Sequence, residues 1–249
     1  MSWFEGRTAV VTGGGTAGIG RATAARLATE GAHVFISGRR EAELDEAVGV
    51  IGPNVTAVPG DITVPADLDR LYAAVADRGR GLDVLVANAA AASFATLDTI
   101  AEEEFYRIFD VNVKGTLFTV RKALPLLNEG SSVVVTGSTT ADRGVASMGA
   151  YSASKAAVRS LVRTWAVELA DRGIRVNAVT PGPTDTSGVT ELVGAENVEA
   201  YKSAQGAQML LGRVARPDEV AAAITFLASP ESSFVLGAEL YVDGGANQV

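Results

Sequence analysis

Apolar runs typical of buried strands alternate with helical patterns from one end of this chain to the other. The strands are expected at residues 7–12, 33–37, 55–58, 82–87, 132–136, 174–180 and 239–242. Most of these runs are continuously apolar, as in strands buried on both faces of a sheet. Helices between successive strands provide the crossovers that parallel pairing requires. The alternation therefore predicts an α/β fold, with a doubly wound parallel sheet of about seven strands and helices on both faces.

The predicted helices cover residues 21–30, 41–50, 65–77, 102–127, 151–171 and 217–228. The stretch 102–127 reads as one long amphipathic helix, whereas residues 184–211 carry only a weak pattern. No repeat or linker interrupts the 249 residues, and 47% of them are hydrophobic, enough for one large core. Residues 1–249 are therefore expected to form a single domain.

A glycine cluster, GGGTAGIG at residues 13–20, separates the first strand from the first helix. Glycines let the backbone approach a pyrophosphate closely, and a helix N-terminus supplies free N–H groups and a positive dipole end. A tight turn without a ligand is the alternative. The place of the cluster between a strand and a helix favours dinucleotide binding.

Tyr151 and Lys155 lie four residues apart in the predicted helix 151–171, so their side chains share one face. An ammonium near a phenol favours the phenolate and lowers the tyrosine pKa from its usual value of about 10. Ser138 follows the strand 132–136, at the edge where open α/β sheets bind ligands. Together these residues indicate proton transfer to a bound oxygen, although Tyr-x-x-x-Lys alone is often an ordinary surface pair.

The composition argues against several other functions. Acidic residues number 29 against 21 lysines and arginines, and the net charge of −8 disfavours a nucleic-acid partner. No apolar run reaches the length of a membrane span. With no cysteine and only His33 as histidine, thiolate chemistry, histidine catalysis and a metal site are not expected. The cysteine-free sequence also fits the cytoplasm.

This order of motifs resembles the short-chain dehydrogenase/reductase family, in its single-domain branch of about 250 residues. The resemblance covers essentially the whole chain and implies a Rossmann-type sheet, a nicotinamide cofactor and hydride transfer to or from a carbonyl or alcohol substrate. The residues that match the catalytic positions of the family are Asn112, Ser138, Tyr151 and Lys155. The cofactor is expected to contact Gly14, Thr16, Gly18, Ile19, Gly20, Arg39, Asp61, Ile62, Asn88, Lys155, Pro181, Gly182, Thr184 and Thr186.

The resemblance also implies a role for each catalytic residue. Tyr151 passes a proton to or from the substrate oxygen, and Ser138 holds that oxygen. Lys155 lowers the pKa of Tyr151 and binds the nicotinamide ribose, while Asn112 positions a water that links Lys155 to solvent. As structural alternatives, Ser138 could cap a strand end and Asn112 could bond within its own helix.

Two departures from the family pattern stand out. The motif T-G-x-x-x-G-x-G is one residue longer here, which leaves either Gly13 or Gly14 as the first glycine. The family segment N-N-A-G appears as Ala87-Asn88-Ala89-Ala90, without its first asparagine and its glycine.

The residue that ends the second strand selects the cofactor in this fold, because a carboxylate there binds the ribose 2′-hydroxyl of NAD and repels a 2′-phosphate. That position is Gly38, and Arg39 and Arg40 follow it. NADP(H) is therefore expected, with NAD(H) possible. The alternative is that both arginines only begin a solvated helix, where Glu41 and Glu43 neutralise them.

Three further expectations concern the surroundings of the site. Residues 184–211 should form a substrate lid, and the apolar loops near the catalytic residues favour an uncharged or modestly polar carbonyl or alcohol. Apolar positions beyond one stripe on the helices 102–127 and 150–171 predict a homotetramer. The alternative functions are a dehydratase or epimerase, which usually needs a longer chain, a non-catalytic dinucleotide-binding regulatory protein of the same fold, and a structural subunit of a larger assembly.

Overall fold

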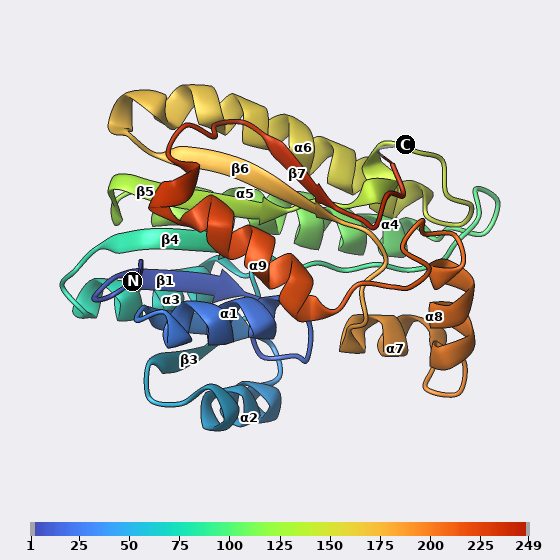
Figure 1. Ribbon diagram of the computed structural model, residues 1–249, viewed down its shortest axis with the longest axis horizontal. Coiled ribbons are helices and arrows are strands. Elements are labelled where there is room, and N and C mark those ends of the chain that lie inside the picture. The colour runs from blue at the N-terminus through green and yellow to red at the C-terminus, as the bar shows by residue number, and fades with distance from the viewer. Residues whose placement is uncertain (1–2, 248–249) are drawn as a thin grey trace.

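A computed structural model describes residues 3–247 and shows seven parallel strands in one sheet, in the order β3-β2-β1-β4-β5-β6-β7 (Figure 1). The strands are β1 (Thr8–Thr12), β2 (His33–Gly38), β3 (Val55–Pro59), β4 (Leu82–Ala87), β5 (Leu127–Thr136), β6 (Arg175–Pro181) and β7 (Glu239–Val242). The chain builds outward from β1 to β3 and then returns to place β4 on the other side of β1. In open α/β sheets ligands bind at the carboxyl ends of the strands beside such a reversal. The predicted doubly wound sheet is confirmed.

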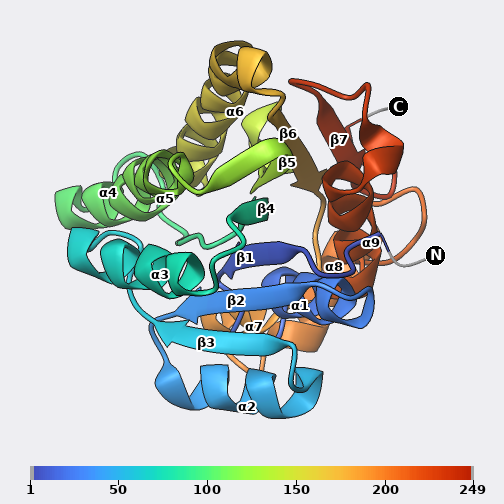
Figure 2. The same cartoon turned by 90° about the vertical axis from the view of Figure 1, so that its left-hand side faces the viewer.

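Helices cover both faces of the sheet (Figure 2). One layer holds α1 (Ile19–Thr29), α2 (Glu41–Ile51) and α9 (Pro217–Ala228), and the other holds α3 (Pro65–Asp77), α4 (Glu102–Phe109), α5 (Thr116–Ala123) and α6 (Gly149–Leu169). Successive residues of a strand point to opposite faces of the sheet: Val134 packs in the core with α9, while Val133 and Val135 pack in the core with α6. None of the helices formed by residues 3–247 is long and apolar enough to cross a membrane.

The prediction of one helix over residues 102–127 is wrong. Helix α4 ends at Phe109, and a π-helical turn follows from Asp110 to Gly115 before α5. Gly115 has no room for a side chain, because a Cβ would lie 2.7 Å from Ile62 Cδ1. The wide turn lets the backbone approach Ile62, and such turns are frequent at functional sites. Strand β5 already begins at Leu127, five residues before the predicted start.

The weakly patterned region 184–211 contains two short helices, α7 (Ser187–Val193) and α8 (Val198–Gly206). Gly206 is the only residue of these two helices that is fully buried. Because these helices bury so little surface, their sequences show no clear apolar stripe, and the sequence pattern did not predict them.

Candidate active site

The carboxyl edge of the sheet collects nearly all the residues that the sequence singles out. The glycine turn follows β1, Arg39 follows β2, Asn88 follows β4 and Ser138 follows β5. Asp61 and Ile62 come just after β3, and Pro181 ends β6. Because parallel strands all point the same way, their carboxyl ends bring these segments to one edge.

The first turn after β1 depends on glycine at two positions. Gly13 has a positive φ of 68°, which favours glycine, and its N–H donates to the Ser37 carbonyl oxygen over 2.8 Å. A Cβ on Gly20 would lie only 2.2 Å from the Gly13 oxygen, so α1 can pack this closely only with glycine there. Gly14 faces the side chain of Ile36. The geometry therefore gives the tight turn to Gly13, while cofactor contact by Gly14 stays a prediction.

The start of α1 is open for an anion. Gly18 precedes the helix, and no side chain caps the first turn that begins at Ile19. Free N–H groups at a helix start bind phosphate readily. Thr16 lies in the same turn, and Thr186 at the start of α7 packs against Gly18, 3.3 Å from where a Cβ would lie. These expected cofactor residues therefore lie together.

Asn88 ties three strand ends to one another. Its side-chain N–H donates to the Thr12 carbonyl oxygen over 3.1 Å, and its amide oxygen accepts from Thr136 Oγ1 over 3.3 Å. The Thr12 hydroxyl oxygen in turn accepts from the backbone N–H groups of Asn88 and Ala89. The carboxyl ends of β1, β4 and β5 are thus held together, although the N-N-A-G segment is altered.

The two residues after β3 have structural partners as well. The Asp61 carboxylate accepts hydrogen bonds from the backbone N–H and the hydroxyl of Thr63, at 2.8 and 2.7 Å, which forms an Asx turn. Ile62 is buried against Gly115 of the π-helical turn. Both remain predicted cofactor contacts.

Ser138 and Tyr151 meet at this edge. Ser138 is buried and begins a short 3-10 turn, where its hydroxyl oxygen accepts from the Thr140 N–H over 3.3 Å. The same hydroxyl lies close enough to the phenol of Tyr151, in the first turn of α6, to act on the pKa of that phenol. Ser138 therefore caps the turn and also contacts the candidate proton donor.

The predicted lowering of the Tyr151 pKa is wrong for this structure. Burial raises the pKa of Tyr151, and the nearby Ser138 hydroxyl lowers it only in part. The Lys155 ammonium lies 5.7 Å from the centroid of the Tyr151 ring and donates to the Thr136 carbonyl oxygen over 2.9 Å. Lys155 is itself only 3% exposed, and burial lowers its pKa to about 8. Desolvation is thus the largest influence on the pKa of both groups.

Asn112 acts between segments rather than within its own helix. Its amide oxygen accepts from the Ala91 N–H over 2.7 Å, and its N–H groups donate to the Ala91 oxygen and to Ser154 Oγ, both over 2.9 Å. Ser154 then donates to the Tyr151 carbonyl oxygen over 2.6 Å. Asn112 and Ser154 therefore fix the loop after β4 against the first turn of α6. Ser154 was not predicted as a site residue. Its one indication in the sequence is its position three residues after Tyr151.

Replacing Lys155 by methionine is expected to change how stability depends on pH. With a pKa of about 8 in the folded state and about 10.4 when unfolded, Lys155 binds fewer protons in the folded state between these values. Its contribution to the free energy of unfolding therefore rises with pH across this window. From pH 7 to pH 10, the wild type should gain about 2–3 kcal/mol relative to Lys155→Met. Urea unfolding at both pH values measures the gain, and a constant difference would contradict it.

Residues of the segment 184–211 contact the surroundings of the candidate site at several points. Thr184 is buried and donates to the Gly182 oxygen over 3.0 Å, and the Ser187 N–H donates to the Ala17 oxygen over 2.8 Å. In α8, the ring of Tyr201 lies 6.4 Å from that of Phe94, and the nearby Tyr201 phenol adds to the raised pKa of Tyr151. Tyr201, which pairs with Phe94 and was not predicted from the sequence, therefore lies near Tyr151.

The two arginines after β2 differ in their surroundings. Arg39 is exposed and forms no ion pair with any residue that the structure describes, whereas Arg40 pairs with Glu43 and with Glu191 of α7, each at 2.7 Å. Gly38 has space for a side chain, since a Cβ would lie 3.8 Å from its nearest neighbour. Glu43 thus neutralises Arg40, as the alternative reading expected, but leaves Arg39 available for a phosphate.

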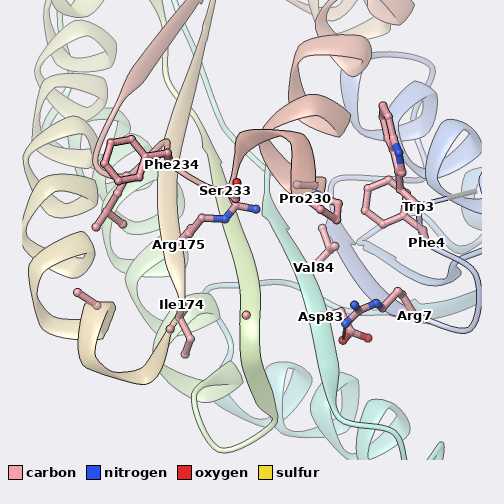
Figure 3. A pocket seen from close by; sticks show the side chains of 15 residues that line it. Trp3, Phe4, Arg7, Asp83, Val84, Ile174, Arg175, Pro230, Ser233 and Phe234 are labelled. Carbon is pink, nitrogen blue, oxygen red and sulfur yellow. Dashed lines mark hydrogen bonds and ion pairs between the residues drawn. The ribbon is translucent and has the colours of Figure 1, made fainter.

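A cavity of about 710 Å³ lies far from this chemistry, at the amino ends of the strands. Figure 3 shows its wall, where Arg7 and Asp83 form an ion pair beside Phe4 and where Phe234 flanks Arg175. Arg7 precedes β1 and Arg175 begins β6, so this hollow opens at the opposite edge of the sheet from Ser138. Size alone therefore does not mark the active site.

Comparisons with known proteins agree with this geometry. The family described as enoyl-(acyl carrier protein) reductase matches residues 14–247. The chain is 45% identical to oxidoreductase asL5 of Sarocladium schorii, over 99% of this chain and 98% of the relative. A short chain dehydrogenase from Burkholderia cenocepacia in complex with NADP has a TM-score of 0.90 and 34% identity, over 98% of this chain and 99% of that one.

A 3-ketoacyl-(acyl-carrier-protein) reductase from Brucella melitensis complexed with NADH has a TM-score of 0.89 and 33% identity, covering 97% of this chain and 98% of that one. Sequence similarity and shared topology thus extend over nearly the full length of each relative. The chain belongs to the short-chain dehydrogenase/reductase family of oxidoreductases.

Proposed function

We propose that the protein interconverts an uncharged carbonyl compound and its alcohol with NADP(H), and that Tyr151 is the proton donor and acceptor. The observation that carries the proposal is the contact between Tyr151 and Ser138 at the carboxyl edge of the sheet, with Lys155 buried beside them. When bound there, the nicotinamide supplies or accepts the hydride. The residues of the chain hold the substrate oxygen and move one proton.

The raised pKa of Tyr151 suits the direction of reduction. A phenol whose pKa lies above its usual value is protonated at neutral pH and can donate its proton to a developing alkoxide. Ser138 can donate a second hydrogen bond to the same oxygen and so orient it. The ammonium form of Lys155 stabilises the phenolate that remains, and its pKa of about 8 keeps that form populated at neutral pH.

The chain fits a dinucleotide through features of its own. Close packing of Gly13 and Gly20 sets the turn between β1 and α1, and a pyrophosphate would bind at the uncapped start of that helix. The unpaired Arg39 would hold a 2′-phosphate, and this favours NADP(H). Lys155 would reach the nicotinamide ribose. Relatives of this family have been solved with NADP and with NADH, so both cofactors remain to be compared.

Turnover in a cofactor-coupled assay across ketones and alcohols tests the function. Oxidation or formation of NADPH with at least one uncharged substrate is expected. Cofactor binding without turnover of any substrate would support a non-catalytic dinucleotide binder instead. Because relatives are named as oxidoreductases and dehydrogenases, that alternative is not favoured.

The walls around the site support an uncharged substrate and a lid. Phe94 lies against Tyr201, which is near Tyr151, and the buried Met148 pairs with Ala95, the residue after Phe94. Residues 184–211, which carry Tyr201, would close over a bound substrate and exclude water. No charged side chain is part of this aromatic pair.

We also propose a homotetramer. Large apolar side chains are exposed on α4 at Phe105 and Tyr106, on α6 at Val167, and before β7 at Phe234, which is 103% exposed. Phe105 and Tyr106 lie together on α4, and burial of such side chains in an oligomer interface would remove them from water. Light scattering at micromolar concentration is expected to give the mass of four 25.6 kDa chains. A monomer mass under these conditions would contradict the proposal.

A single domain over residues 1–249 and a cytoplasmic location are proposals as well. The described strands join one sheet, which supports the first. The cysteine-free sequence suits a reducing compartment and supports the second.

A further inference from the structure

An ion pair joins two segments that lie 151 positions apart in the sequence. Arg40 Nη1 donates to Glu191 Oε1 over 2.7 Å, so the start of α2 is tied to the middle of α7. Helix α7 also rests on the glycine turn, where the Ser187 N–H donates to the Ala17 oxygen over 2.8 Å. The first lid helix is therefore fixed at the pyrophosphate end and at the end of β2.

The second of these contacts lies where the cofactor is selected. Arg40 stands two residues after Gly38, the position that faces the ribose 2′-substituent in this fold. Its guanidinium is shared between Glu43 on its own helix and Glu191 from the lid, and the hydrogen bond with Glu191 raises the pKa of Arg40. A 2′-phosphate held by Arg39 would therefore lie near the carboxylate of Glu191, which is already paired with the neighbouring Arg40.

Glu191 opposes the phosphate in two ways. While the pair is intact, Arg40 offers the phosphate fewer free donors. When Arg40 turns to the phosphate, α7 loses one of its anchors and a carboxylate is left unpaired nearby. Glu43 does not tie the lid in this way, because it lies three residues after Arg40 at the start of α2.

We propose that Glu191 is a specificity-determining residue, which weakens binding of the NADP(H) 2′-phosphate by competing for Arg40 and thereby couples the phosphate to release of α7. The proposal rests on the nicotinamide cofactor site described above. Coupling between sites is reciprocal, so a phosphate that displaces Glu191 loosens α7 by the same factor by which docked α7 weakens the phosphate. NAD(H), which lacks this phosphate, should not respond to Glu191.

The test is the variant Glu191→Gln in the full-length protein, with dissociation constants for NADPH and NADH measured by titration at low ionic strength. NADPH affinity is expected to rise about two- to fivefold, the factor that an exposed ion pair typically supplies. NADH affinity should stay within about 1.5-fold. The matched control is Glu199→Gln, which removes a partner of Lys202 at 3.0 Å in the same lid and no partner of Arg40, and should change neither affinity.

Two outcomes would overturn the proposal. Equal gains for NADPH and NADH would mean that the variant acts through general lid mobility. An undiminished NADPH gain in an Arg40→Gln background would mean that Glu191 does not act through Arg40. A wild type that prefers NADH would refute the proposed cofactor preference, yet a selective NADPH gain in Glu191→Gln would still support the role of Glu191.

Discussion

Replacing Tyr151 by phenylalanine is expected to lower kcat by a hundredfold or more, because general acid catalysis typically contributes about 10²–10⁴. The change removes only the transferable proton and the phenol oxygen near Ser138, and it keeps the ring in the first turn of α6. The dissociation constant of NADPH should therefore stay nearly unchanged. Steady-state kinetics and cofactor titration measure the two quantities separately.

The control for this variant is Tyr201→Phe, which removes the other phenol near the site and preserves the ring that faces Phe94. It should cost much less than Tyr151→Phe. Retention by Tyr151→Phe of more than a tenth of wild-type kcat, with chemistry rate-limiting, would end the assignment. A tenfold loss corresponds to only about 1.4 kcal/mol of barrier, so this threshold is lenient.

The location of the candidate site could be predicted from the sequence, because it depends only on the strands being parallel. Once the apolar runs predict parallel strands, the residues that follow them must meet at one edge. Ser138, Asn88 and the glycine turn are each defined by such a position. Their place in the structure therefore required no knowledge of side-chain contacts.

The directions of the pKa shifts of Tyr151 and Lys155 could be determined only from the three-dimensional structure. The spacing of Tyr151 and Lys155 predicts a lowered tyrosine pKa, yet burial raises it and lowers that of the lysine. Spacing along a helix reports which side chains are neighbours, but not how much water each one has lost. The same limit hid Ser154, whose hydrogen bond with Asn112 joins α6 to the π-helical turn.

The contacts of α7 with Arg40 and with the glycine turn could not be predicted from the sequence either. Arg40 and Glu191 are 151 positions apart and lie on exposed surfaces without periodic pattern. The sequence suggested local partners for Arg40, and one of them, Glu43, is present. Glu191, the partner from a distant segment, reaches Arg40 because α7 packs on the glycine turn.

The double variant Gly38→Asp with Arg39→Leu is expected to shift the ratio of kcat/KM for NADPH over that for NADH by about ten- to a hundredfold toward NADH, because hydrogen bonds to charged groups contribute about 1.5–3 kcal/mol. The leucine removes the unpaired guanidinium, and the aspartate can bind a ribose 2′-hydroxyl and repel a 2′-phosphate. The new side chain fits, because the Gly38 Cβ would lie 3.8 Å from Leu44 Cδ2.

Gly38→Ala is the matched control, since it fills the same space without a carboxylate and keeps Arg39. Its cofactor ratio should equal that of the wild type. A wild type that favours NADH would contradict the proposed preference, and so would a ratio that the double variant leaves unchanged. Because Arg40 is already shared by Glu43 and Glu191, the ratio should depend on Arg39 more than on Arg40, and Arg40→Leu alone should shift it less than Arg39→Leu alone.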